Sequence, residues 1–239
     1  MRKLLVICAV SMACGIAGAA PVGSAAKIGS VRLKGYLGER LDAMIERHVC
    51  GADVDYITAP FMEKTETKGW WQAEFWGKWM HSAVPYLGYC GSEKLRSSID
   101  RGIDRMLASQ EPNGYIGNYP DELRCGEGWD VWGMKYTLMG LLHYYDFLRR
   151  AGTSRPTLAG LKLVGFAAET NDVLKEAARK CREKGLSFIV ANDVTQKGCG
   201  FGTDTNRVTF VFPDGTQKRF PLMTKRMVAK RVLDEVSGL

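Results

Sequence analysis

Histidine is scarce in this chain of 239 residues, and its cysteines lack the spacing of a metal site. The three histidines, His48, His81 and His143, share no ligand spacing, and each is more typical of a helix surface or a core position. None of the seven cysteines forms a C-x-x-C pair, which argues against a zinc ribbon. We therefore expect no metal site.

Tryptophan and tyrosine are missing from the last 90 residues, although six Trp and nine Tyr precede residue 150. The second part instead holds most of the net positive charge, with 15 basic and nine acidic residues after residue 150 against 18 basic and 17 acidic ones over residues 1–150. Its basic residues do not alternate with aromatic ones, so we expect no nucleic-acid partner. This change of composition predicts two segments of different origin that join near residue 150.

Long apolar runs are also lacking, apart from one at the start of the chain. Arg2 and Lys3 precede an apolar stretch over residues 4–16, and Ala17-Gly18-Ala19 follows it. This order is typical of a secretory signal peptide, and the stretch is too short to span a bilayer. We predict a signal peptide over residues 1–20, a secreted or periplasmic protein, and no membrane association after its removal.

The first segment has the apolar spacing of helices and almost no alternation of period two. Four helices are predicted, over residues 37–48, 71–89, 93–107 and 129–148. We expect a loop at residues 53–60, a turn at residues 110–115, and a kink or helix end at Pro85. The segment is predicted to form a helical array or an (α/α) toroid.

Aromatic side chains and carboxylates lie near one another in this segment, a combination that suits sugar binding. Glu74, Tyr115, Asp130 and Trp132 are the candidate carbohydrate-binding residues. The alternative is that the aromatic residues belong to the core and that the acids are solvated or paired.

Four ordered motifs carry a resemblance over residues 35–148: GYLGER from Gly35, WQAEFWGKW from Trp71, QEPNGYIG from Gln110 and WDVWGMKY from Trp129. Together they resemble the N-terminal part of glycoside hydrolase family 127, the β-L-arabinofuranosidase-like proteins. The resemblance implies a toroid, an exported enzyme and a plant-polysaccharide substrate. Its catalytic cysteine and zinc ligands lie downstream of these motifs, and Cys50, Cys90 and Cys125 match none of them, so the catalytic residues are unknown.

The second segment reads as an α/β unit after a polar junction at residues 149–160. Strands are predicted at residues 161–167 and 188–191, separated by a helix at 171–184 that Thr170 caps and Gly185 closes. This order predicts a right-handed, parallel βαβ unit. A hairpin of residues 208–212 and 218–221 and a helix at 223–236 complete a partial Rossmann-like fold.

Lys180 and Lys184 lie four positions apart on one face of the predicted helix. Two such ammonium groups can bind a polyphosphate, although a solvated basic face is the commoner use of a lysine pair.

A second resemblance covers residues 161–236. VGFAAET from Val164, IVANDV from Ile189 and GFG from Gly200, continuing to Asn206 and Val208, resemble the C-terminal end of phosphopantothenoylcysteine synthetase (phosphopantothenate–cysteine ligase). The resemblance implies that Phe166 lies at the cytidine nucleotide and that Lys180 and Lys184 contact the phosphates of CTP. No covalently bound cofactor is implied, and the nucleotide-binding strands of that family's first half have no counterpart here.

The two resemblances imply different compartments, because CTP and phosphopantothenate are cytoplasmic whereas a signal peptide directs export. Three functions stay open for this chain. It is a CTP-binding, ligase-like fragment related to coenzyme A biosynthesis, or an exported fragment that binds or processes carbohydrate, or a fusion without activity, whether natural or an artefact. Its small-molecule ligand is accordingly a nucleotide or a carbohydrate.

Overall fold

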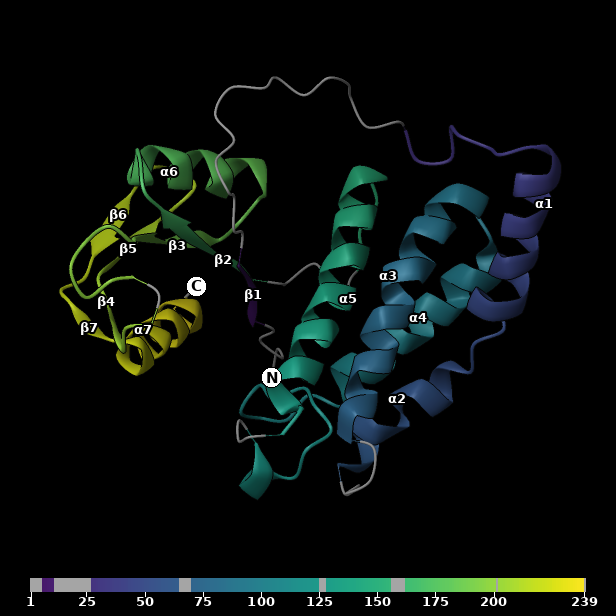
Figure 1. Cartoon of the computed structure of the whole chain (residues 1–239), viewed down its shortest axis with the longest axis horizontal. Coiled ribbons are helices and arrows are strands. Elements are labelled where there is room, and N and C mark those ends of the chain that lie inside the picture. Colours follow the sequence, from purple (N-terminus) through teal and green to yellow (C-terminus); the bar gives the residue numbers. More distant parts are fainter. Residues whose placement is uncertain are drawn as a thin grey trace. The chain divides into compact units, whose positions relative to one another are not determined.

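A computed structural model describes residues 6–10, 27–64, 70–124, 128–155, 162–200 and 202–238. The chain divides into two compact units. A helical unit comprises residues 21–159, and an α/β unit comprises residues 1–20 together with 160–239 (Figure 1).

The structure confirms the prediction that residues 35–148 are mostly helical. Its helices are α1 (Gly35–Met44), α2 (Val54–Glu63), α3 (Ala73–Cys90), α4 (Glu93–Ala108) and α5 (Asp130–Arg150). A π-helical turn at Ile45–Val49 extends α1, and short 3-10 turns lie at Trp70–Gln72 and Asp121–Leu123. The described helices show a helical unit, and its closure into a toroid stays a prediction.

The prediction of a loop at residues 53–60 is wrong, because these residues form most of α2. Asp53 caps the helix, its carboxylate accepting a hydrogen bond from the backbone N–H of Tyr56 at 3.1 Å. Val54, Thr58 and Phe61 recur at helical spacing and are buried. Burial of this face outweighs the helix-breaking tendency of Pro60, which lies inside the helix.

Pro85 does not end its helix. It lies inside α3, which continues to Cys90 and is terminated by Gly91 in the left-handed conformation, with φ +64°. The apolar stripe of α4 is buried as its spacing predicts, with Leu95, Ile99 and Ile103 fully inaccessible.

Glycines allow α3 and α5 to approach closely. A Cβ atom on Gly77 of α3 would collide with the carbonyl oxygen of Tyr136 in α5. A Cβ atom on Gly133 of α5 would lie 2.6 Å from the Cβ of Ala73 in α3. Gly77 and Gly133 belong to the second and fourth motifs, so part of each motif serves helix packing.

The α/β unit contains a five-stranded sheet of order β1-β2-β3-β5-β6. The strands are β1 (Val6–Val10), β2 (Lys162–Glu169), β3 (Phe188–Asp193), β5 (Val208–Val211) and β6 (Gln217–Arg219). β1, β2 and β3 run parallel, and β5 runs antiparallel to β3 and β6. The adjacent parallel strands and the hairpin are therefore confirmed within a mixed sheet. A second, two-stranded sheet pairs β4 (Thr205–Asn206) with β7 (Met223–Thr224).

Helix α6 (Val173–Glu183) begins later than predicted. Its N-cap is Asp172, which has φ +46° and makes no side-chain capping bond, so Thr170 does not cap the helix. Gly185 follows the helix at φ +62°, which confirms its predicted role as the stop signal.

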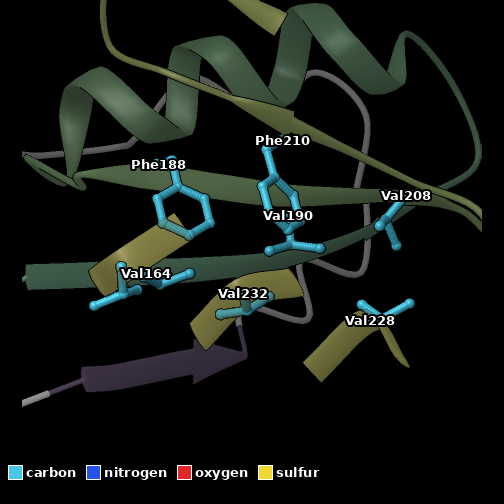
Figure 2. Close-up of a cluster of buried hydrophobic side chains, with 8 residues drawn as sticks. Val164, Phe188, Val190, Val208, Phe210, Val228 and Val232 are labelled. Carbon is cyan, nitrogen blue, oxygen red and sulfur yellow. The ribbon is translucent and has the colours of Figure 1, made fainter. Parts of the chain in front are cut away.

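The core of the α/β unit lies between the sheet and α7 (Lys225–Ser237). Eight buried residues form it: Val164, Phe188, Val190, Val208, Phe210, Val228, Val232 and Val236. Figure 2 shows Val228 and Val232 of α7 beside the valines and phenylalanines of the sheet. Helix α6 packs on the sheet through its own buried residues, Ala177 and Cys181.

Strand β1 falls within the predicted signal peptide. Val6–Val10 pair in parallel with residues 162–166 of β2, and the other residues of the 1–20 stretch lie outside the described part. Removal of this stretch stays a prediction. In the described part of the chain, every helix is too short or too polar to cross a bilayer.

Candidate functional site

Lys180, a candidate phosphate ligand, is buried in the α/β unit. It is 5% exposed, and its ammonium group donates a hydrogen bond to the carboxylate of Glu169 at the end of β2. Because Glu169 is also largely buried, the two charges compensate each other away from solvent. Lys180 is therefore held inside the unit and is not displayed on a solvated face.

Lys184 lies one turn further on, at the C-cap of α6, and is exposed. The structure thus places the two lysines in different environments, one buried in an ion pair and one at the surface. Convergence of both ammonium groups on one phosphate chain requires Lys180 to share or release Glu169.

Phe166 lies on the opposite face of the sheet from Glu169. Successive side chains of a strand point to opposite faces, and Phe166 packs against the core beneath α7. It lines a pocket of 280 Å³ together with Asn206, Lys225 and one face of α7. The structure therefore brings Phe166 to Lys225 and not to Lys180.

A larger pocket of 540 Å³ lies on the α6 face of the sheet, which we call the α6-face pocket. Its cationic lining residues are Lys175, Arg207 and Arg219, and its acidic ones are Asp172 and Asp193. The first turn of α6 also lines it, so backbone N–H groups add to the positive potential. The arrangement favours an anionic ligand.

Asp193 is held in place at the rim of the α6-face pocket. Its carboxylate accepts hydrogen bonds from the hydroxyl of Thr195 at 2.6 Å and from the side chain of Gln196 at 3.0 Å. These bonds lower the pKa of Asp193. Asp193 is also the register partner of Glu169, so the buried Lys180–Glu169 pair lies next to this pocket.

Sequence reasoning missed Lys175, Arg207, Arg219 and Lys225 as pocket residues. Lys175 lies on α6, Arg207 between β4 and β5, and Arg219 on β6, so only the folded sheet brings them together. Lys225 begins α7 just after its cap residue Thr224, a position that the sequence could have indicated.

In the helical unit, Glu74 of α3 and Trp132 of α5 form a surface pair. The indole N–H of Trp132 donates to Glu74, and the Lys78 ammonium donates to the other carboxylate oxygen at 2.6 Å. Burial raises the pKa of Glu74, but these two hydrogen bonds outweigh it and lower the pKa below its ordinary value. Glu74 is therefore a fixed anion at neutral pH.

Tyr115 and Asp130 form a second, internal pair. The Tyr115 hydroxyl donates to Asp130 at 2.6 Å and accepts from the backbone N–H of Tyr119 at 3.0 Å. Asp130 is 1% exposed, and burial together with this carboxylate raises the pKa of Tyr115. The pair ties the loop before α5 to the first turn of that helix, a structural task.

Two further aromatic rings lie beside Trp132 of this pair, and we call Trp129, Trp132 and Tyr136 the aromatic patch. Trp129 is 54% and Trp132 is 41% exposed, with ring centroids 6.2 Å apart. Tyr136 lies edge-on to Trp132 at 5.3 Å, and the Lys135 ammonium lies 3.9 Å from the Trp132 ring centroid. Trp76, by contrast, is fully buried, as the core alternative predicts for the aromatic residues.

The cysteines and histidines show no cluster of metal ligands among the described residues. Cys50, Cys90, Cys181 and Cys199 are free thiols, and Cys125 lies outside the described residues. The rings of His81 and His143 are tilted by 50° to each other, with centroids 4.1 Å apart.

The C-terminal part of the chain is related to a domain of coenzyme A biosynthesis. The family model for the DNA/pantothenate metabolism flavoprotein C-terminal domain matches residues 134–239. The Coenzyme A biosynthesis bifunctional protein CoaBC of Bacillus subtilis is 49% identical over 77 residues, 32% of this chain and 19% of that protein. The CoaBC protein of Escherichia coli K12 is 43% identical over 74 residues, 31% of this chain and 18% of that protein.

A crystal structure of the C-terminal domain of CoaBC is 45% identical, covers 33% of this chain and 37% of that chain, and has a TM-score of 0.27. The chain spans about a fifth of the length of the curated relatives it matches. Its C-terminal segment is related to the phosphopantothenoylcysteine synthetase domain of CoaBC.

Proposed function

We propose that the α/β unit binds CTP as a remnant of a phosphopantothenate–cysteine ligase, and that the chain alone does not catalyse ligation. The relation of the C-terminal segment to CoaBC carries this proposal. The α6-face pocket supports it, because its cations and the first turn of α6 suit a phosphate-bearing ligand.

In this proposal Lys180 and Lys184 contact the phosphates on the α6 face of the sheet. Phe166 lies on the opposite face beside Lys225, so it is not part of this phosphate site. The α6-face pocket adds Arg207 and Arg219 on the same sheet face as Lys180. An exposed charge contact contributes on the order of 1 kcal/mol or less, so we expect weak, salt-sensitive binding. A phosphate also has to compete with Glu169 for Lys180.

Calorimetric titration of CTP into the full chain tests the proposal at low and at high salt. We expect Lys184→Ala and Arg207→Ala each to weaken binding several-fold, and Lys180→Ala/Lys184→Ala to abolish it. Lys230→Ala is the matched control, since Lys230 is an exposed lysine on α7 that pairs with Asp234.

Equal CTP affinity in the wild type, Lys184→Ala and Arg207→Ala would contradict the binding proposal. The ligation step is tested separately, with phosphopantothenate, cysteine and CTP. Turnover by the wild type would show that the chain is a complete ligase.

A second candidate function is carbohydrate binding by the aromatic patch. The exposed rings of Trp129 and Trp132 beside the fixed carboxylate of Glu74 favour it, because rings stack on sugar C–H surfaces and carboxylates accept hydroxyl hydrogen bonds. The test is affinity electrophoresis in gels that contain soluble arabinan. We expect Trp132→Ala to lose retardation and Tyr56→Ala, which removes a more exposed aromatic ring elsewhere in the helical unit, to keep it.

The third function is a fusion without activity, and it is favoured if neither CTP nor arabinan binds. Whether the protein is exported depends on the predicted signal peptide and is tested separately from ligand binding. Fractionation of cells and mass spectrometry of the N-terminus would show whether residues 1–20 are removed and the protein exported.

A further inference from the structure

A pocket in the helical unit lies apart from both candidate sites, near the ends of α3 and α5 and away from the aromatic patch. Its volume is 410 Å³, within the range of small-molecule sites. Helix α3 contributes Val84, Pro85, Gly88 and Tyr89, and α5 contributes His143, Asp146, Phe147 and Arg150. The segment before α1 closes it through Lys27, Ile28, Gly29 and Val31.

The segment that closes the pocket is fastened by specific contacts. Arg32 donates to the carbonyl oxygen of Cys90 at 3.0 Å, and its guanidinium lies 4.6 Å from the ring centroid of Tyr89. The Tyr89 hydroxyl accepts a hydrogen bond from the backbone N–H of Leu33 at 3.1 Å. These contacts fix the segment against the end of α3, and a wall that is already ordered lowers the entropic cost of binding.

A glycine shapes the interior of the pocket. A Cβ atom on Gly88 would lie 3.5 Å from Phe147 and 3.6 Å from Ile28. A methyl group fits there at ordinary van der Waals distance, whereas a longer side chain would enter the pocket. Val84, Ile28 and Phe147 therefore leave an apolar space suited to a hydrocarbon or aromatic group.

Positive charge exceeds negative charge around this apolar space. Lys27 and Arg150 line it, and Asp146 is its one carboxylate among the lining residues. Asp146 is already paired with Arg149 at 3.0 Å and with Arg150 at 4.0 Å. Burial and the neighbouring His81 lower the pKa of His143 below its ordinary value, so this lining residue adds little positive charge at pH 7.

We propose that this pocket binds a small amphipathic carboxylate, with its apolar body against Val84 and Phe147 and its carboxylate toward Lys27 and Arg150. The pocket belongs to the helical unit, so this inference is independent of CTP binding, and it shares no lining residue with the aromatic patch, so it is also independent of carbohydrate binding.

The test uses 4-phenylbutyrate as the probe and 4-phenylbutan-1-ol as its uncharged analogue, both titrated into the full chain by calorimetry. We expect the acid to bind at least fivefold more tightly than the alcohol. Arg150→Ala should weaken binding of the acid at least fivefold, whereas its affinity for the alcohol should stay within twofold of the wild-type value. Arg149→Ala is the matched control, because Arg149 is equally exposed and pairs with the same Asp146 but does not line the pocket.

Gly88→Leu fills the apolar space and should abolish binding of both compounds, with its fold checked by circular dichroism. Equal affinity of acid and alcohol would overturn the proposal, and so would equal effects of Arg149→Ala and Arg150→Ala. If Gly88→Leu does not fold, the two arginine variants still decide the outcome, because they change exposed side chains at the end of α5.

Discussion

Lys180 on α6 and Glu169 on β2 form an ion pair in which only 7% and 12% of the side chains are exposed. The pair fastens the helix to the end of the strand on which it packs. Lys180, which the sequence predicts to be a phosphate ligand, thus also neutralises the buried carboxylate of Glu169. Loss of ligand binding in a Lys180 variant has to be separated from loss of stability.

Replacement of Lys180 by Met should destabilise the α/β unit by about 3 kcal/mol, because it leaves the charge of Glu169 without its partner. The double variant Lys180→Met/Glu169→Leu should recover most of that loss. Urea unfolding followed by circular dichroism measures both. A single variant as stable as the double one would show that the pair is not coupled.

Gly77→Ala should destabilise the helical unit by about 1–3 kcal/mol, because the added methyl group collides with the backbone of Tyr136. Gly88→Ala, in the same helix, should instead be neutral or stabilising by up to about 1 kcal/mol, since its Cβ meets only ordinary contacts and alanine favours helix. Thermal melts of the two variants compare them directly. A similar loss in both would contradict the close approach of α3 and α5.

The helical unit should lose stability in acid through Glu111. Arg124 donates two hydrogen bonds to this carboxylate, at 2.6 and 2.8 Å, and they lower its pKa below the ordinary 4.5. A lowered pKa in the folded state gives stability above the unfolded pKa, and this stability is lost as the pH falls through the folded pKa. Urea midpoints of Glu111→Gln should therefore fall less than those of the wild type between pH 5 and about 3.

The matched control for Glu111 is Glu122→Gln, which removes an exposed glutamate in the same loop region. Its pH dependence should follow the wild type. An unchanged acid transition in Glu111→Gln would show that Glu111 and Arg124 do not stabilise this loop.

Tyr115→Phe should destabilise the helical unit by roughly 1–3 kcal/mol, because Asp130 loses a hydrogen bond while it remains buried. Tyr56→Phe removes the hydroxyl of an exposed tyrosine and should change the midpoint of urea unfolding little. If the two variants unfold alike, the Tyr115–Asp130 pair does not hold the loop before α5. The binding of arabinan by folded Tyr115→Phe should be retained.

The predictable parts of this fold are those that local patterns determine. The stripe Leu95, Ile99, Ile103 has the period of a helix with one buried face. The apolar run over residues 188–191 follows the helix stop at Gly185 and has the length and the branched residues that favour a buried strand. The sequence wrongly predicts a loop at residues 53–60. Proline is a helix breaker, but the cap at Asp53 and the burial of Phe61 stabilise helix α2 in spite of Pro60.

The candidate sites were harder to predict because their geometry depends on distant residues. The spacing of Lys180 and Lys184 gives a shared helix face, but only the pairing of β2 with β3 brings Glu169 within reach of Lys180. Tyr115 and Asp130 are an aromatic residue and an acid, which the sequence makes candidates for sugar binding or for a core pair. Their burial against each other is a tertiary property that no local pattern encodes.

The pairing of β1 with β2 has a consequence for how the chain folds during synthesis. Val6 pairs with Lys162, so β1 leaves the ribosome about 150 residues before the strand that it joins. Closure of such a long loop is entropically costly, and contacts this distant in sequence slow folding. The whole helical unit, residues 21–159, is synthesised after β1 and before β2, the strand with which β1 pairs. During that interval its unpaired backbone groups and its apolar sequence, VICAV, are accessible to chaperones, to the export machinery and to other nascent chains.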